Sequence, residues 1–384
     1  MIERYAQAVD AAVEAGAFLG GGMCVIESDG SEQAYVTGQV HPASATDPGC
    51  LDAPRIRMRM ASISKAATAR IACALAVEGV LDLDAEVRAL LDWPDAPALM
   101  HGVSLRHLLT HLSGLTDAAG YIFERPQSPM AFIEARADEI GSGQGPGRWF
   151  RYCNLNFVLA GAVLEAVTGE RFDLLARRYV FDPAGIGGGF NWAGVSVEER
   201  ACRLPIYQRY GDRLERQTEP EMADWGADIV WGDGRGFAFA DYVPVRDTLL
   251  FSPHAGLRMS VIEAARLARL LGDESPAGTL QRETQWKFDP TAPNGSDCDG
   301  HFGEFGLGLT IYRAEPRLPG PLIGHAGHAL GFTGGVWHNE ATGRSAALFL
   351  TGSADLTDGL DDEVFYGAEE LALMQFLFSE RQSG

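Results

Sequence analysis

The chain has 384 residues, of which 46% are hydrophobic and 22% are charged. This balance excludes an intrinsically disordered protein, which lacks the apolar surface that offsets the entropy of ordering a chain. The net charge of −21 argues against a partner with a phosphate backbone and against an anionic membrane surface. The length exceeds the roughly 250–300 residues at which a single core stops growing, so we expect two lobes.

The first residues carry apolar side chains at helical spacing, from Ile2 to Val13, with acidic residues between them. They predict an amphipathic helix rather than a secretion signal, and no apolar run reaches the roughly 18 residues that a membrane span requires. The six cysteines form no CxxC pair and show no metal-site spacing. We therefore expect a cytoplasmic protein with reduced thiols.

The next elements follow in chain order from their hydrophobic patterns. Two short strands flank Asp29 and Gly30 and predict a hairpin. An apolar, Ala-rich stretch at residues 62–80 predicts a helix that is buried on nearly every side and ends at Gly79. The other expected elements are helices at 105–112, 155–167 and 363–378, loops at 141–147 and 211–242, and strands at 23–28, 33–39, 305–312, 322–326, 335–338 and 345–351.

Strands at both ends of the chain around a helical middle predict an α+β fold. We expect one central antiparallel sheet, built from both chain ends and flanked by helices. Residues 1–95 and 250–384 would form this sheet domain, and residues 96–249 would form an inserted, mainly helical domain. The active site would then lie at the interface between the two.

Lysine is rare in this chain, because the 31 basic residues are 29 arginines and only two lysines, Lys65 and Lys287. A general preference for arginine explains the total. Since arginine cannot lose its proton in a protein whereas lysine can, a position that stays lysine indicates proton chemistry.

Lys65 follows Ser62 by three residues in the segment MASISK, residues 60–65. This spacing puts both side chains on one face of a helix. If Ser62 lies in the first turn, its Oγ and its N–H are at the positive helix end, which suits an oxyanion. Burial that lowers the lysine pKa from about 10.4 towards 7 would make the pair a nucleophile and its base. A chance SxxK sequence is the alternative.

Two further segments carry groups that suit the same chemistry. In FRYCN, residues 150–154, the Tyr152 hydroxyl can relay a proton and the Asn154 amide can bridge a lysine and a substrate carbonyl. A buried tyrosine with a satisfied hydroxyl is the alternative there. In GHAGH, residues 324–328, Gly327 would let a substrate approach an edge strand, and the N–H of His328 would be a second oxyanion donor.

The order SxxK, YxN and HxG resembles the serine β-lactamase and penicillin-binding-protein-like family, in its class C and esterase branch. The resemblance covers nearly the whole chain. Its other segments are VSLRHLLTHLSGL at 103–115, YCNLNFVLAGA at 152–162 with VTG at 167–169, FGLGL at 305–309 and GHAGHALGF at 324–332.

The resemblance implies that Ser62 is the nucleophile that becomes acylated, while Lys65 and Tyr152 share the general base and acid work. It further implies that Asn154 positions the substrate and that the N–H groups of Ser62 and His328 form the oxyanion hole. Water then hydrolyses the acyl-enzyme. The implied reaction needs no metal and no cofactor.

His325 departs from the family pattern, because β-lactamases and carboxypeptidases of this fold carry Lys or Arg there to receive the substrate carboxylate. An imidazole with a pKa near 6.5 is mostly neutral at pH 7 and binds a carboxylate poorly. We therefore expect a small ester, amide or D-amino-acid derivative as substrate, with a class C-like β-lactamase as the alternative. The oligomeric state stays open.

Two other classes of function remain as alternatives. A metallohydrolase would use His107 and His111, four residues apart on a predicted helix, together with His325 and His328. HLLTH lacks the Glu of HExxH, and the resemblance explains His111 as a residue at a helix end. A penicillin-binding-protein homologue that only binds its ligand is the second alternative, and it gives no reason for a deprotonatable lysine.

Overall fold

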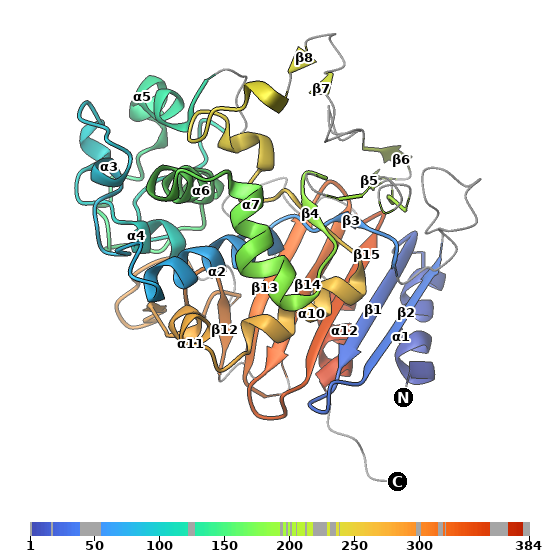
Figure 1. The fold of residues 1–384 in the computed structure, drawn as a ribbon. Helices are drawn as coiled ribbons and strands as arrows, with labels where there is room; N and C mark the ends of the chain where they lie inside the picture. The colour runs from blue at the N-terminus through green and yellow to red at the C-terminus, as the bar shows by residue number, and fades with distance from the viewer. Residues whose placement is uncertain are drawn as a thin grey trace.

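The computed structural model describes residues 2–16, 18–38, 55–121, 127–192, 195–196, 199, 202–204, 206–211, 213–217, 229–230, 236–237, 239–296, 301–313, 318, 320–353 and 368–378. Its main feature is an antiparallel sheet, flanked by helices (Figure 1). The strand order is β10 (Trp286–Lys287), β11 (Glu304–Phe305), β12 (Thr310–Tyr312), β13 (Leu322–Ala329), β14 (Phe332–Asn339), β15 (Ser345–Thr351), β1 (Gly20–Ile26) and β2 (Glu32–Gly38). The N-terminal hairpin joins the C-terminal strands where β1 pairs with β15, which confirms an α+β fold with a sheet from both chain ends.

Helices cover both faces of this sheet. Because successive residues of a strand face opposite sides, each strand contributes side chains to two separate cores. In β1, Cys24 and Ile26 belong to the main core, which includes the buried face of α10 (Val261–Leu271). Met23 and Val25 belong to a second core with α1 (Ile2–Glu14) and α12 (Ala368–Phe378). Figure 1 shows α10 crossing one side of the sheet, with α1 and α12 on the other.

The helices that carry the candidate site are α2 (Ile63–Val77), α4 (Leu105–Leu109) and α6 (Asn154–Thr168). Alanines on several sides let α2 be buried almost completely, as its composition predicts. Helix α6 ends at Gly169, whose φ of 68° gives the left-handed cap that favours glycine. The other short helices are α3 (Val87–Leu90), η3 (Ala98–Met100), α5 (Pro129–Ile140), α7 (Phe172–Ala176), η4 (Arg177–Phe181), α8 (Asp182–Ala184), η5 (Phe239–Asp241), η6 (Thr248–Phe251) and α11 (Pro276–Arg282).

Some predicted elements differ from the structure. The strand expected at 305–312 is two strands, β11 and β12, because the chain turns at Gly308. This residue has φ +62°, and a Cβ there would lie 2.9 Å from the Lys65 carbonyl oxygen, so the turn requires glycine. The stretch 211–242, expected to be irregular, contains β6 (Arg213–Arg216), β7 (Ile229–Val230) and β8 (Gly236–Phe237), and much of the rest lies outside the described residues. Residues 363–367 of the last predicted helix also lie outside them.

A small sheet leads the chain into α2, with β9 (Leu257–Met259) between β3 (Met58–Arg59) and β4 (Gly189–Phe190). The remaining hairpin pairs β5 (Tyr207–Tyr210) with β6. In the described part of the chain, no helix is both long enough and apolar enough to cross a membrane. The division into domains at residues 95/96 and 249/250 stays a prediction.

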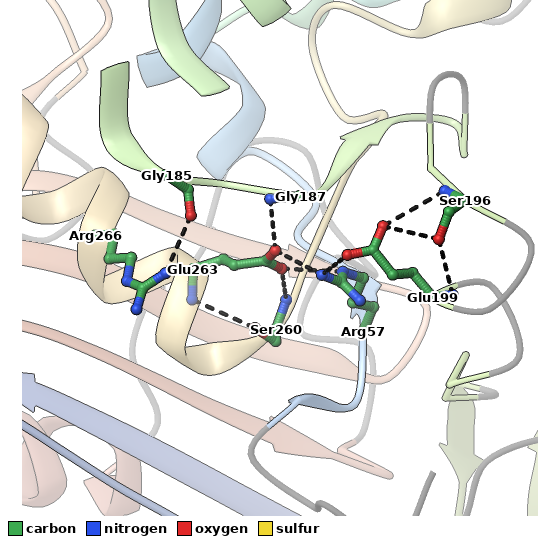
Figure 2. Close-up of polar contacts among 8 residues, drawn as sticks. All are labelled: Arg57, Gly185, Gly187, Ser196, Glu199, Ser260, Glu263 and Arg266. Atoms are coloured by element: carbon green, nitrogen blue, oxygen red, sulfur yellow. Dashed lines mark hydrogen bonds and ion pairs between the residues drawn. The ribbon is translucent and has the colours of Figure 1, made fainter. Parts of the chain in front are cut away.

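A buried ion pair anchors the start of β3 to α10. Arg57 contacts Glu263 at 2.7 Å and Glu199 at 2.9 Å (Figure 2). Glu263 also accepts hydrogen bonds from the N–H groups of Ser260 and Gly187, each at 2.8 Å. Because breaking such a pair would leave an uncompensated buried charge, this cluster fixes the strand that precedes α2.

Candidate active site

The beginning of α2 brings Ser62 and Lys65 together, as their spacing predicts. Ser62 is the N-cap residue of the helix and is partly exposed, whereas Lys65 is 0% exposed. Lys65 Nζ donates a hydrogen bond to Ser62 Oγ at 2.8 Å. An accessible alcohol therefore contacts a buried amine at the positive end of a helix.

Lys65 Nζ has two further acceptors. It donates to Asn154 Oδ1 at 2.7 Å and to the main-chain oxygen of His254 at 3.2 Å. With Ser62 Oγ, these acceptors match the three N–H groups of an ammonium. The other lysine, Lys287, has a largely exposed side chain and pairs with Glu304. Only Lys65 therefore has the burial that proton chemistry requires.

The turn before Ser62 is strained. Ala61 has φ +45°, in the left-handed region that non-glycine residues rarely adopt. Its carbonyl oxygen accepts hydrogen bonds from the N–H of Ser64 at 3.1 Å and from Ser64 Oγ at 2.6 Å. Ser64 Oγ in turn accepts from the N–H of Leu257 at 2.9 Å, so β9 supports the turn. Backbone strain of this kind concentrates at functional sites.

Tyr152 lies in the extended segment just before α6. Its ring packs against His111, with ring centroids 4.3 Å apart, and is stacked with Phe302 at 5.4 Å. The main-chain oxygen of His111 accepts from the N–H of Arg151 at 3.0 Å, and its Nδ1 accepts from the N–H of Cys153 at 3.1 Å. His111 therefore holds the residues on both sides of Tyr152.

Asn154 begins α6 and is oriented by a residue that the sequence analysis missed. Its Nδ2 donates to Asp117 Oδ2 at 2.9 Å, so its Oδ1 faces Lys65. Asp117 follows α4 and lies 37 residues before Asn154. It lies two residues after the segment 103–115 that carries part of the family resemblance, but no local pattern marks it as a partner of Asn154.

On β13, His325 lies beside Tyr152, with ring centroids 6.1 Å apart. Burial lowers the pKa of His325 to about 3, and the neighbouring Lys65 adds to this effect. Its imidazole is therefore neutral at pH 7, and the cause is burial rather than an ordinary pKa near 6.5. Nδ1 lies 2.6 Å from the carbonyl oxygen of Ala326, which places the proton on Nδ1 and the lone pair on Nε2.

Gly327 packs against the segment that enters α2, since a Cβ at this position would lie 2.5 Å from the main-chain oxygen of Met60. The structure thus gives a reason for glycine here besides the predicted approach of a substrate. The strand is also not the edge strand we expected, because β13 lies between β12 and β14. However, β12 pairs only with residues 322–324, so within the described residues the half with His328 has a neighbouring strand on one side alone.

A family model of β-lactamases matches residues 5–368. The chain belongs to the β-lactamase family. This membership confirms the resemblance predicted from the motifs.

Individual members of the β-lactamase family match less of the chain. It is 29% identical over 181 residues to penicillin-binding protein 4* of Bacillus subtilis. This match covers 46% of this chain and 39% of that protein. It is 27% identical over 163 residues to penicillin-binding protein 4 of Amycolatopsis lactamdurans. This match covers 41% of this chain and 41% of that protein. The matches thus span about two fifths of these relatives. The D-amino acid amidase of Ochrobactrum anthropi, solved with D-phenylalanine, has the same fold, with a TM-score of 0.68 at 19% identity over 98% of this chain and 97% of its own.

In this β-lactamase-family protein, three imidazoles near Lys65 are neutral. Burial, with the charge of Lys65 as the next cause, lowers the pKa values of His111, His254 and His325 below the usual range of histidine. The site therefore does not accumulate positive charge around its lysine.

The histidines of the metallohydrolase alternative are engaged differently. His107 caps α4, where its Nδ1 accepts a hydrogen bond from the N–H of Ser104 at 3.2 Å, and His111 packs against Tyr152. Within the residues that the structure describes, no three His, Cys, Asp or Glu side chains are placed to hold a metal ion.

Proposed function

We propose that this protein is a serine hydrolase that forms an acyl-enzyme on Ser62 and acts on small esters, amides or D-amino-acid derivatives. The observation that carries this proposal is the contact of a fully buried Lys65 with the partly exposed alcohol of Ser62 at 2.8 Å. The Lys65 amine also lies 4.8 Å from the centroid of the Tyr152 ring. The three groups that acyl transfer requires, a nucleophile, a base and a proton relay, are thus adjacent.

The proposed reaction has two halves. In the first, Ser62 Oγ attacks the substrate carbonyl carbon, and its proton passes to the Lys65–Tyr152 pair, which enters this step with one of its two groups deprotonated. The N–H groups of Ser62 and His328 stabilise the oxyanion that forms. The tetrahedral intermediate then expels an alcohol or amine, which takes up this same proton from the pair through the Tyr152 hydroxyl.

In the second half, a water molecule attacks the carbonyl carbon of the ester on Ser62. The same pair of basic groups takes the water proton and returns one to Ser62 Oγ as the ester bond breaks. The products are a carboxylic acid and the free enzyme.

The environment of His325 supports the substrate class. With a pKa lowered to about 3, this imidazole supplies no cation at pH 7 to receive a substrate carboxylate. A substrate without a carboxylate beside the scissile bond fits that site. The D-amino acid amidase of Ochrobactrum anthropi shares only the fold, so it adds D-amino-acid amides to the compounds that deserve a test.

A class C-like β-lactamase is the second candidate, because the family model that matches residues 5–368 is that of β-lactamases. The neutral His325 argues against it. In this alternative the same acyl-enzyme would form by opening of the lactam ring.

A substrate panel separates these candidates. Wild-type protein is assayed with p-nitrophenyl acetate, D-phenylalanine amide and a chromogenic cephalosporin. We expect an initial burst with the ester, turnover of ester or amide, and little turnover of the cephalosporin. The control is Ser128→Ala, which removes the serine that caps α5 and should leave the rates unchanged. Preferential turnover of the cephalosporin would support the second candidate instead.

A further inference from the structure

Asp117 is bound to the start of α6 through both of its carboxylate oxygens. Oδ2 accepts hydrogen bonds from the main-chain N–H of Asn154 at 2.7 Å and from Asn154 Nδ2 at 2.9 Å. Oδ1 accepts from the N–H of Leu155 at 3.0 Å and from Cys153 Sγ at 3.3 Å. The N-cap residue Cys153 makes no capping bond with its own side chain, so Asp117 caps this helix from a distant loop.

The contact with Nδ2 determines which way the Asn154 amide points. A carboxylate only accepts hydrogen bonds, so it selects the NH₂ end of the amide and leaves Oδ1 for Lys65 Nζ at 2.7 Å. A flipped amide would set its oxygen against the carboxylate and its NH₂ against the lysine donors. Both hydrogen bonds would then be lost at once.

The orientation also matters on the substrate side. Nδ2 carries two N–H groups, and Asp117 is its one acceptor among the described residues. The other N–H is therefore available to a substrate carbonyl next to Ser62 and Lys65. One carboxylate thus controls two properties of Asn154: the acceptor that it offers to the lysine, and the donor that it offers to the substrate.

We propose that Asp117 is a positioning residue for acyl transfer, which acts by holding the Asn154 amide in the orientation that Lys65 and the substrate require. The inference rests on the acyl-enzyme function proposed above. Asp117 takes no proton in the reaction and touches no reacting atom. Its effect on rate passes through Asn154.

The test must separate this role from helix capping. Asp117→Asn keeps an oxygen for the main-chain N–H groups of α6, but its own NH₂ can face Asn154 Oδ1, so both amide orientations become possible. Ser128→Ala is the matched control, because Ser128 caps α5 through the N–H of Ala131 at 3.1 Å and belongs to no part of the candidate site. It should lower thermal stability and leave the chemistry unchanged.

The experiment measures the burst rate constant with p-nitrophenyl acetate from pH 5 to 10, together with thermal unfolding. We expect Asp117→Asn to slow acylation between about tenfold and a hundredfold, the rate equivalent of one charge-assisted hydrogen bond. The rise of rate with pH should move to lower pH, because the flipped amide no longer accepts from the ammonium form of Lys65. Asp117→Glu, which keeps a carboxylate, should recover part of the rate.

A double-mutant cycle tests whether the effect passes through Asn154. In an Asn154→Ala background, Asp117→Asn should cause no further loss of the acylation rate. Losses that add, or an Asp117→Asn variant with the wild-type rate and pH profile, would overturn the inference while the proposed function stands. A wild-type protein that none of these substrates acylates would instead overturn the proposed function, and this inference with it.

Discussion

Lys65 Nζ lies 2.8 Å from Ser62 Oγ, with the amine fully buried and the alcohol partly exposed. Only the serine of this pair can meet a substrate directly. The lysine can act on the reaction through the serine proton, because its Nζ contacts Ser62 Oγ from the buried side. The proposed chemistry depends on this division between an accessible nucleophile and a buried base.

Replacement of Lys65 by arginine keeps the positive charge but removes the ability to accept a proton. We expect Lys65→Arg to lower kcat/KM for p-nitrophenyl esters by about a hundredfold to ten-thousandfold, the usual range of general base catalysis. Lys287→Arg is the matched control, because this lysine is exposed and arginine can keep its ion pair with Glu304. A Lys65→Arg variant with nearly wild-type activity would reduce Lys65 to an electrostatic support.

Replacement of His325 by lysine supplies the cation that relatives of this fold carry at this position. We expect His325→Lys to raise β-lactam acylation relative to ester hydrolysis, and to lower the melting temperature because a second ammonium would lie near Lys65. His325→Gln, which stays neutral, should leave the ratio of the two rates unchanged. An unchanged ratio in folded His325→Lys protein would contradict our account of substrate choice.

Stability should fall in mild acid because of His325. Its pKa is about 3 in the folded chain and near 6.5 when unfolded, so below pH 6.5 only the unfolded chain takes up this proton. Between pH 7 and pH 5 this histidine alone should lower the free energy of unfolding by about 2 kcal/mol. Urea titrations at both pH values should show a loss smaller by that amount for His325→Gln. Equal losses in both proteins would show that His325 is not held neutral.

The strain at Ala61 can be measured against an alanine in regular helix. Ala67 is fully buried in α2, so Ala67→Gly loses helix propensity and a buried methyl group. Ala61→Gly also loses a buried methyl group, but it relieves the left-handed backbone at φ +45°. We expect its cost in free energy of unfolding to be smaller by about 1–2 kcal/mol. Equal costs for the two variants would argue against strain in this turn.

The local features of the site were predictable from the sequence because they depend on short-range spacing. A spacing of three positions from Ser62 to Lys65 suffices to place both side chains on one helix face. Apolar, strand-like segments predicted most strands of the sheet, and their position at both chain ends predicted that both ends contribute to it. The prediction of one strand at 305–312 was wrong at Gly308. The chain turns there because it packs closely against α2, which the hydrophobic pattern of the segment itself does not show.

The missed features depend on contacts between segments that are distant in the chain. Asp117 reaches Asn154 across 37 residues. The strain at Ala61 is held by Ser64 and the N–H of Leu257, which lies 193 residues from that serine. The low pKa of His325 depends on burial that a single strand does not show. These relationships became visible only once the fold brought the segments together.

The central claim is that Ser62 is the residue that becomes acylated, and covalent labelling tests it most directly. A fluorophosphonate reacts with an activated serine by forming a bond from Oγ to phosphorus and releasing fluoride. Intact mass spectrometry with peptide mapping should show one phosphonyl group per chain on Ser62, and none on a folded Ser62→Ala variant. A wild-type protein that stays unlabelled, or one labelled equally in the Ser62→Ala variant, would contradict the account.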